Sequence, residues 1–398
     1  MAFLIQHGHG KSEKIENALN DGVDGVILGA KHEAPEKLSA YLDELTHGYE
    51  CHRLFDPQFF VSTLVPPNEG HLSEYPYFRS GLSSGNFTLR KVRAMADDVL
   101  RFQDSLSITA MISPTVIFDS FNDRWAQIAL NLADASLEAH TALSNPKPLL
   151  LAFHFSEQAL SSHDDVGRFL DTVTQDGWDM HGFYLALARH DSEYTAGFES
   201  DRLANLLYIA NVLGRVNGLQ VVFGYADFCG LPIRGAGASA FAGGWHQSQR
   251  RFLKSKFLQR TSTGGQPPRP RYASAPLLTS ILVSELRDIY EIGMLNDVLS
   301  GTELDEIITS DPDAIARTWN GPLSHRQHFQ CLKLLDSKVG NSVQSNLKEL
   351  RRRIADAQAL YANLESLGIS FDSTTDGAHL AEWDQGITTF AGWAGFAV

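Results

Sequence analysis

Side chains that could carry out acid–base or nucleophilic chemistry follow six apolar runs of this sequence. They stand in HGHGKS (7–12), FDPQFF (55–60), FDSFND (118–123), HFSEQ (154–158), ARHD (188–191) and ADFCGLPIR (226–234). Carboxylates can act as nucleophiles or transfer protons, and arginine can bind an anion or the edge of a base. One such segment would be ordinary, but six that meet on one face of a fold predict a polar pocket.

Two aspartates are the candidates for catalysis. Asp56 precedes a proline, so it could equally be a turn residue whose carboxylate accepts backbone N–H groups. Asp227 lies in GYADFCGLPIRGAGASAFAGGW (224–245), which holds more small residues than a simple turn requires. Both aspartates directly follow apolar runs, where a barrel or sheet would present them at a strand end.

Other residues of these segments are candidates for binding a substrate, and each has a structural alternative. Asp119 could instead cap a helix that begins near residue 122. His154 and Glu157 could pair with each other, or Glu157 could pair with a basic neighbour. Arg189 could form a structural ion pair rather than bind an anion. The aromatic side chains that could stack on a base are Phe59, Phe60 and Tyr225.

The elements that must position these side chains are eight apolar runs. They span 2–6, 22–30, 51–55, 108–118, 148–155, 182–188, 219–225 and 238–244. Continuous rather than alternating runs are typical of parallel strands covered on both faces. Helical patterns lie between most of them, as at 12–22, 90–106, 123–143 and 201–216. This arrangement predicts an α/β fold, a (β/α)8 TIM barrel with a C-terminal helical extension, with reactive groups at the C-terminal strand ends. An open doubly wound sheet is the alternative.

The chain divides into three regions by composition. We expect a catalytic barrel over 1–260 and a Pro/Gly linker over 261–276, which contains GGQPPRPRYASAP. Residues 277–398 have mainly helical patterns, and their aromatic-rich tail, HLAEWDQGITTFAGWAGFAV, is expected to pack back onto the barrel.

Anion-binding residues are expected near the end of the barrel. GAGASAFAGGW (235–245) is typical of a phosphate loop, in which glycines let backbone N–H groups approach an anion, although small residues also serve tight packing. The phosphate candidates are Arg234, Gly237, Gly243 and Gly244. Residues 249–272 contain seven Lys or Arg and no acid, so this segment could bind tRNA or DNA, or form a solvated last helix and linker. Its nucleic-acid candidates are Arg250, Arg251, Lys254 and Lys256.

Composition restricts the class of protein. The chain is 43% hydrophobic and 20% charged, with a formal net charge of −14 that opposes non-specific binding to nucleic acid or membranes. Three distant cysteines argue against a disulfide framework and a Cys-rich zinc site, and they fit a reducing cytoplasm. The sequence has neither a secretory signal pattern nor an apolar run of membrane-spanning length. We expect a cytoplasmic protein without a metal or another cofactor.

The segment GYADFCGLPIR resembles a motif of the tRNA-guanine transglycosylase superfamily, G-x-D-x-F-D-C-x-x-P-T-R on strand seven, with spacings that differ by about one. The matching residues are Gly224, Asp227, Phe228, Cys229, Pro232 and Arg234. LFDPQFF (54–60) is similar to the family's strand-three segment L-x-D-S-G-x-x-Q. Residues 182–189 match its base-recognition segment in place. The resemblance covers the barrel only.

The resemblance implies base exchange at a nucleoside, with 7-deazaguanine or guanine as the base. Asp227 would attack C1′ as oxocarbenium-like charge develops, forming a glycosyl-enzyme intermediate. Asp56 would manage protons on the leaving and incoming bases, a task that suits a raised pKa. The residues that would contact the base are Asp119, His154, Glu157, Arg189, Phe59, Phe60 and Tyr225.

Two departures from the family pattern concern the acceptor. The strand-six glycines of the family are replaced by Leu185–Leu187, and the Cys-x-Cys-x-x-Cys…His zinc site of the tRNA-acting members is absent. The chain is therefore more similar to divergent, zinc-less branches that act on DNA or stand in phage-defence operons beside enzymes of 7-deazaguanine synthesis.

Two other functions fit the same sequence. A phosphate- or flavin-binding barrel could act on a small metabolite through Gly237, Gly243 and Gly244. A barrel that has lost catalysis could bind a partner protein in a defence system, and its activity would then survive replacement of Asp56 and Asp227.

Overall fold

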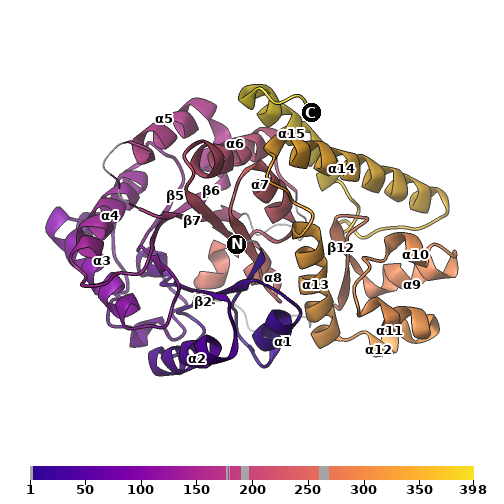
Figure 1. Cartoon of the computed structure of the whole chain (residues 1–398), viewed down its shortest axis with the longest axis horizontal. Helices are drawn as coiled ribbons and strands as arrows, with labels where there is room; N and C mark the ends of the chain where they lie inside the picture. The colour runs from indigo at the N-terminus through magenta and orange to yellow at the C-terminus, as the bar shows by residue number, and fades with distance from the viewer. Residues whose placement is uncertain (1–2, 176–177, 179, 190–196, 260–268) are drawn as a thin grey trace.

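The computed structural model describes residues 3–175, 178, 180–189, 197–259 and 269–398, and its core is a closed parallel barrel with helices outside it (Figure 1). The barrel strands pair in the order β3-β2-β1-β9-β8-β7-β6-β4. A parallel bridge between Leu54 and Ala110 joins the two ends of this order and closes the ring. The strands are β1 (Phe3–Gln6), β2 (Gly25–Gly29), β3 (His52–Asp56), β4 (Met111–Ile112), β6 (Leu149–Ser156), β7 (Gly182–Arg189), β8 (Gln220–Gly224) and β9 (Ala240–Gly243).

Each of the eight predicted apolar runs supplies one barrel strand. The run at 108–118 supplies β4 and also β5 (Ile117–Phe118), which extends the pairing along β6. The (β/α)8 barrel is therefore confirmed, and the open-sheet alternative is wrong. The helices between strands are α1 (Lys14–Asn20), α2 (Pro35–Gly48), α3 (Leu89–Asp104), α4 (Arg124–Thr141), α5 (His163–Val173), α6 (Ser200–Asn211) and α7 (Gly230–Ala236).

Alternate residues of the strands fill the inside of the barrel, because successive side chains of a strand point to opposite faces. The interior cluster is small and apolar apart from one tyrosine: Leu4, Ile27, Leu54, Ala110, Ile112, Leu150, Ala152, Tyr184, Val222, Ala240 and Ala242. The intervening residues, such as Phe3 and Phe241, join the larger core beneath the helices, where their rings lie 5.2 Å apart. Burial on both faces is the physical reason that the runs are continuous.

The eighth barrel helix comes from the C-terminal region. Among the described residues, the helix directly after β9 is the short α8 (Gln247–Arg250), whereas α13 (Gly321–Asp336) packs on β1 between α1 and α7. The Phe329 ring of α13 lies 6.2 Å from the Phe3 ring, and Lys333 Nζ lies 2.6 Å from a carboxylate oxygen of Asp24. The C-terminal region therefore completes the barrel wall.

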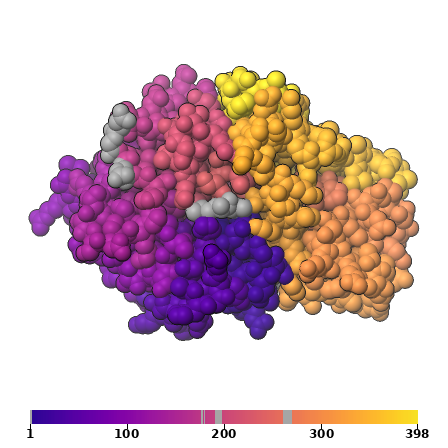
Figure 2. Space-filling view, viewed as in Figure 1, coloured from indigo at the N-terminus to yellow at the C-terminus, as the bar shows by residue number. Residues whose placement is uncertain are grey.

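The rest of the C-terminal region forms a block on one side of the barrel (Figures 1 and 2). An antiparallel hairpin of β11 (Arg271–Ser274) and β12 (Thr279–Leu282) precedes it. The expectation of a simple linker over 261–276 is wrong for 271–274, because these residues pair with β12; residues 261–268 lie outside the described part. The helices are α9 (Val283–Glu291), α10 (Leu295–Val298), α11 (Asp305–Ser310), α12 (Ile315–Thr318), α13, α14 (Val343–Ser366) and α15 (His379–Ala394).

The aromatic-rich tail packs onto the barrel, as the sequence predicts. It forms α15, which lies along α6, and Gly386 allows α15 to approach the Ser200 carbonyl closely. The Trp393 ring stacks at 4.0 Å from the His163 ring of α5. Within the described residues, no helix is both long enough and apolar enough to cross a bilayer.

Candidate functional site

Asp56 is the last residue of β3 and points into the top of the barrel. It stands two residues after Leu54, so it shares that residue's inward face. The carboxyl accepts hydrogen bonds from the Gln58 backbone N–H at 2.9 Å, the Tyr184 hydroxyl at 3.2 Å and the Tyr225 hydroxyl at 3.4 Å. Burial outweighs these bonds and raises the pKa of Asp56 to about 6. This carboxyl can therefore exchange a proton near neutral pH.

Asp227 follows β8, and a histidine of the C-terminal region forms a hydrogen bond with its carboxylate. His328 of α13 donates its Nε2–H to Asp227 Oδ1 at 2.6 Å, and His328 Nδ1 lies 3.3 Å from Ser280 Oγ of β12. The Asp227 side chain is still 20% exposed, whereas that of His328 is 1% exposed. Three distant parts of the chain thus meet at one carboxylate that solvent can reach.

The electrostatic surroundings of Asp227 keep it ionised. Burial favours the neutral acid, but the attraction of the His328 ring, its hydrogen bond and the charge of Arg250 together lower the pKa of Asp227. Burial and Arg250 lower the pKa of His328, although Asp227 opposes this change. The imidazole is therefore neutral at pH 7, with its proton on Nε2. Its Nδ1 accepts a hydrogen bond from the Ser280 hydroxyl.

The backbone around Asp227 explains the small residues of this segment. Tyr225 and Asp227 have positive φ angles of 57° and 47°, a sparsely populated region for such residues. A Cβ at Gly224 would lie 2.4 Å from the Tyr184 hydroxyl, and one at Gly243 would lie 3.3 Å from Asp227 Cα. The glycines allow these two site residues to approach the backbone closely. Backbone strain of this kind occurs often at functional sites.

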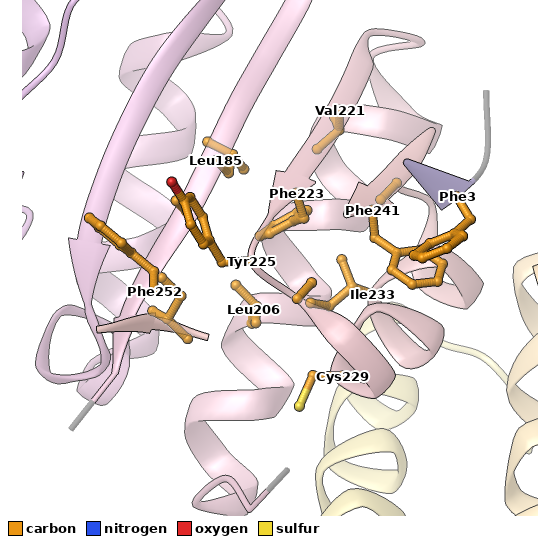
Figure 3. Packing of buried hydrophobic residues seen from close by; sticks show 14 of the residues in the cluster. Phe3, Leu185, Leu206, Val221, Phe223, Tyr225, Cys229, Ile233, Phe241 and Phe252 are labelled. Atoms are coloured by element: carbon orange, nitrogen blue, oxygen red, sulfur yellow. The ribbon is translucent and has the colours of Figure 1, made fainter. Parts of the chain in front are cut away.

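A cavity beside β8, which we call the β8 pocket, opens at Asp227. It measures about 700 Å³ including its opening to solvent. Apolar side chains of β7, β8, α6 and α7 form most of its wall, and the polar lining includes Arg189, Tyr225, Asp227, Arg250, Arg251 and Ser280. Figure 3 shows Tyr225 beside Phe252, with Phe223 and Ile233 on the side of α7.

Asp56 lies deeper, beneath a layer of aromatic rings. Phe252 of β10 (Phe252–Leu253), a short strand paired with the end of β7, packs at 5.3 Å from the His154 ring and 5.2 Å from the Tyr225 ring. Phe60 packs at 5.2 Å from His154. Tyr225 belongs to both places, because its hydroxyl contacts Asp56 and its side chain lines the β8 pocket at which Asp227 lies.

The expected base-contacting residues fall into two groups. His154 and Phe60 are buried in this layer, and burial lowers the pKa of His154 to about 3. Phe59 is buried in the hydrophobic core. Neither ring nitrogen of His154 has a hydrogen-bond partner among the described residues, and His154 does not pair with Glu157. Glu157 forms its ion pair with Arg189 instead, and Arg202 lies 3.8 Å away.

Asp119 lies away from both carboxylates. It is exposed and lines neither the β8 pocket nor the aromatic layer. The predicted helix cap is real but belongs to Asp123, which accepts the Ala126 N–H at 2.7 Å. Asp123 also accepts the backbone N–H of Asp119 at 3.1 Å. Asp123 caps the helix because it lies three residues before Ala126, whose N–H is free at the helix N-terminus, whereas Asp119 lies too far from it.

The expected phosphate loop is wrong in part. Gly237 precedes β9, so it lies at the end of the barrel opposite the carboxylates, and Arg234 pairs with Asp336 of α13 at 3.3 Å. Gly243 is the last residue of β9 and Gly244 follows it, so both lie at the same end of the barrel as the carboxylates. A Cβ at Gly244 would lie 2.3 Å from Gln249 Cβ, so the Gln249 side chain already covers this glycine.

The basic segment is also arranged differently from the expectation. Arg250 and Arg251 are 5% and 8% exposed and line the β8 pocket, so they do not form a solvated outer face. Arg250 Nε donates to the Gly244 carbonyl at 2.9 Å. Lys254 is exposed, and Lys256 is half-buried over the barrel mouth. Residues 260–268 of this segment lie outside the described part.

Two site residues, His328 and Ser280, were not candidates from the sequence. His328 lies 101 residues after Asp227, inside an ordinary amphipathic helix, HRQHFQCLKLLD (325–336). No short motif marks either residue. In the described part of the chain, no three His, Cys, Asp or Glu side chains are grouped to hold a metal ion.

Comparisons with known proteins do not place the chain in a family. No protein-family model and no curated protein sequence matches it. Among solved structures, it is similar to dihydrodipicolinate synthase from Oceanobacillus iheyensis, with 9% sequence identity and a TM-score of 0.22 over 99% of this chain and 96% of that chain. The barrel assignment therefore depends on the strand order and closure described above.

Proposed function

We propose that this barrel catalyses transglycosylase-like base exchange, with Asp227 as the nucleophile and Asp56 as the acid/base. The observation that carries the proposal is the opposite pKa shift of two carboxyls, one in contact with Tyr225 and the other in the pocket that Tyr225 lines. Asp56 has a pKa of about 6, whereas the pKa of Asp227 is below its ordinary value. A pair of carboxyls with separated pKa values is what a reaction with one nucleophile and one proton donor requires.

In the first step, the Asp227 carboxylate attacks C1′ of the nucleoside and the bond from C1′ to the base breaks. The hydrogen bond from neutral His328 holds one carboxylate oxygen, Oδ1, and leaves Oδ2 for the attack. The departing base takes a proton from Asp56 through the Tyr225 hydroxyl, which lies 3.4 Å from the Asp56 carboxyl. The incoming base reverses both steps: it displaces Asp227 from C1′ and returns its proton to Asp56.

The base of this reaction is 7-deazaguanine or guanine, on the strength of the motif around Asp227. The apolar walls of the β8 pocket suit a planar ring, and Thr279, Ser280 and Arg251 provide polar groups at its edge. The acceptor is a nucleic acid in the proposed reaction. A phosphate- or flavin-binding function has less support, because Gly237 lies at the far end of the barrel and Gln249 covers Gly244.

The first test is ligand binding measured by thermal shift. Guanine, preQ₀ and related deazaguanines should raise the Tm of the wild type, whereas flavins and sugar phosphates without a base should not. The second test is incorporation of labelled guanine into tRNA or single-stranded DNA. Asp227→Asn should abolish incorporation, and Asp119→Asn, on an exposed residue outside the pocket, is the matched control. Binding of flavin alone, or unchanged incorporation by Asp227→Asn, would refute the proposal.

A further inference from the structure

A second cavity lies over the barrel mouth and differs in charge from the chain as a whole. This cavity, the mouth cleft, measures about 1150 Å³ including its opening to solvent, and its lining includes Lys31, Lys256, His9, His32 and His71. None of its described lining residues is Asp or Glu. The chain as a whole has 47 acidic and 33 basic side chains. The lining thus differs from the chain as a whole, in which acidic side chains outnumber basic ones. Its positive charge favours an anionic ligand.

The walls of the mouth cleft are already formed. Its outer side is the segment 66–71, joined to 254–259 by backbone hydrogen bonds from Asn68 N to Phe257 O at 2.8 Å and from Gln259 N to Pro66 O at 3.0 Å. Lys31 Nζ donates to the Lys256 carbonyl and lies 4.7 Å from the centre of the Phe257 ring. A ligand would therefore meet a cleft whose walls need little ordering.

Two carboxylates close to lining residues in the sequence are already paired, and one of them, Glu74, pairs with His71 of the lining. Glu33 lies 3.6 Å from His7 and 3.8 Å from Lys11, and Glu74 accepts a hydrogen bond from the His71 ring at 2.8 Å. The Lys256 side chain forms no ion pair among the described residues. Its positive charge is thus available to a ligand.

The histidines add hydrogen-bonding groups to this positive charge. The His9 ring stacks on the His246 ring at 4.4 Å, and the His32 ring lies 6.3 Å from the His9 ring. Amide and hydroxyl groups of Asn68, Ser248 and Gln249 also line the cleft. Ammonium, imidazole and amide groups around one cavity are the groups that bind phosphate oxygens.

Aromatic side chains connect the mouth cleft with the carboxylates. Phe257 and Tyr225 both line the cleft, and Tyr225 also lines the β8 pocket and contacts Asp56. A phosphate bound at Lys256 would have its sugar or base toward these rings, on which a base can stack. The two cavities therefore suit two parts of one nucleotide-containing ligand.

We propose that the mouth cleft binds the phosphate of a nucleoside phosphate unit, with Lys256 as its charge partner, His9 and His32 as hydrogen-bonding groups, and Tyr225 and Phe257 beside the nucleoside. The assignment of the cleft to the phosphate of the acceptor rests on the proposed base exchange. Binding itself requires no turnover, so it can be measured separately.

The test compares GMP with guanosine by calorimetry and a labelled single-stranded oligonucleotide by fluorescence anisotropy, with wild type, Lys256→Gln and Lys254→Gln. Lys254 is the matched control because it lies two residues away, is exposed and does not line the cleft. We expect GMP to bind at least tenfold more tightly than guanosine, and Lys256→Gln to remove most of this difference. For the oligonucleotide, Lys256→Gln should also reduce the slope of log affinity against log salt by about 1.

The outcomes separate the two proposals. Binding of GMP alone would identify a free nucleotide as the ligand, and binding of the oligonucleotide would identify a phosphodiester within a strand. Equal affinity for GMP and guanosine, or equal losses in Lys256→Gln and Lys254→Gln, would overturn the cleft proposal even if base exchange were observed. Phosphate-dependent binding without base exchange by any acceptor would instead refute the proposed reaction and leave the cleft as a nucleotide site.

Discussion

Replacing Asp56 by Asn should change the pH dependence of stability in a defined direction. Burial raises the pKa of Asp56 from 3.8 to about 6, so the folded protein holds this proton more tightly than the unfolded chain does. The free energy of unfolding should therefore decrease as pH rises from about 4 to about 6, and change little above this range. A shift of about two pKa units corresponds to about 3 kcal/mol at pH 7. An uncharged Asn does not incur this cost.

The difference in unfolding free energy between Asp56→Asn and wild type is the quantity to measure. Asn has one acceptor oxygen where Asp has two, so it accepts fewer of the bonds from Gln58, Tyr184 and Tyr225, and each lost bond costs about 1 kcal/mol at every pH. That offset does not vary with pH, so the slope isolates the ionisation of Asp56. Denaturant unfolding followed by tryptophan fluorescence at pH 4.5, 5.5, 6.5 and 7.5 gives the slope, and the difference should rise by about 2 kcal/mol across this range.

Asp119→Asn is the control, because Asp119 is exposed and its difference from wild type should be flat with pH. A flat difference for Asp56→Asn would mean that Asp56 is not buried as an ionisable group. A difference that grew as pH fell would mean that its pKa is lowered rather than raised. Either result would remove the argument for Asp56 as the proton donor.

Two further predictions concern the C-terminal region. His328→Ala should reduce base exchange about 100-fold through misplacement of the Asp227 carboxylate, and it should move the acidic limb of the pH–rate profile to higher pH, because burial would then raise the pKa of Asp227. Intact activity with an unshifted acidic limb would contradict a positioning role for His328. Truncation after residue 276 should give an insoluble or non-cooperatively unfolding chain, because Phe3 and the rest of β1 lose the cover of α13. A soluble fragment with a cooperative melt would show that the barrel closes without α13.

Most of the barrel could be predicted from local sequence because each strand is buried on both faces. Burial of this kind requires a continuous apolar run, and the runs gave the eight strands and the strand-end positions of Asp56 and Asp227. The eighth helix could not be located in the same way. Its pattern in α13 is that of any amphipathic helix, and the pattern does not identify the surface that it covers.

In the candidate site, too, some features depend on local sequence and others on distant residues. Strand ends and aspartates are local features, and the structure places Asp56 inside the barrel mouth and Asp227 at a cavity. The environment of each carboxyl depends on distant residues, because a pKa responds to burial and to charges within a few ångströms. Arg234 illustrates the limit, since its sequence neighbourhood suggested a phosphate, whereas a buried carboxylate of α13, Asp336, is its partner.

The sequence by itself determined that this chain is a (β/α)8 barrel with two aspartates at strand ends, because strand periodicity and burial act over a few residues. The tertiary structure decided which aspartate has a raised pKa, which helix closes the wall and which basic residues face a cavity. These properties depend on contacts between residues far apart in the chain, such as the bond between His328 and Asp227. Only the folded chain brings those two side chains within 2.6 Å of each other.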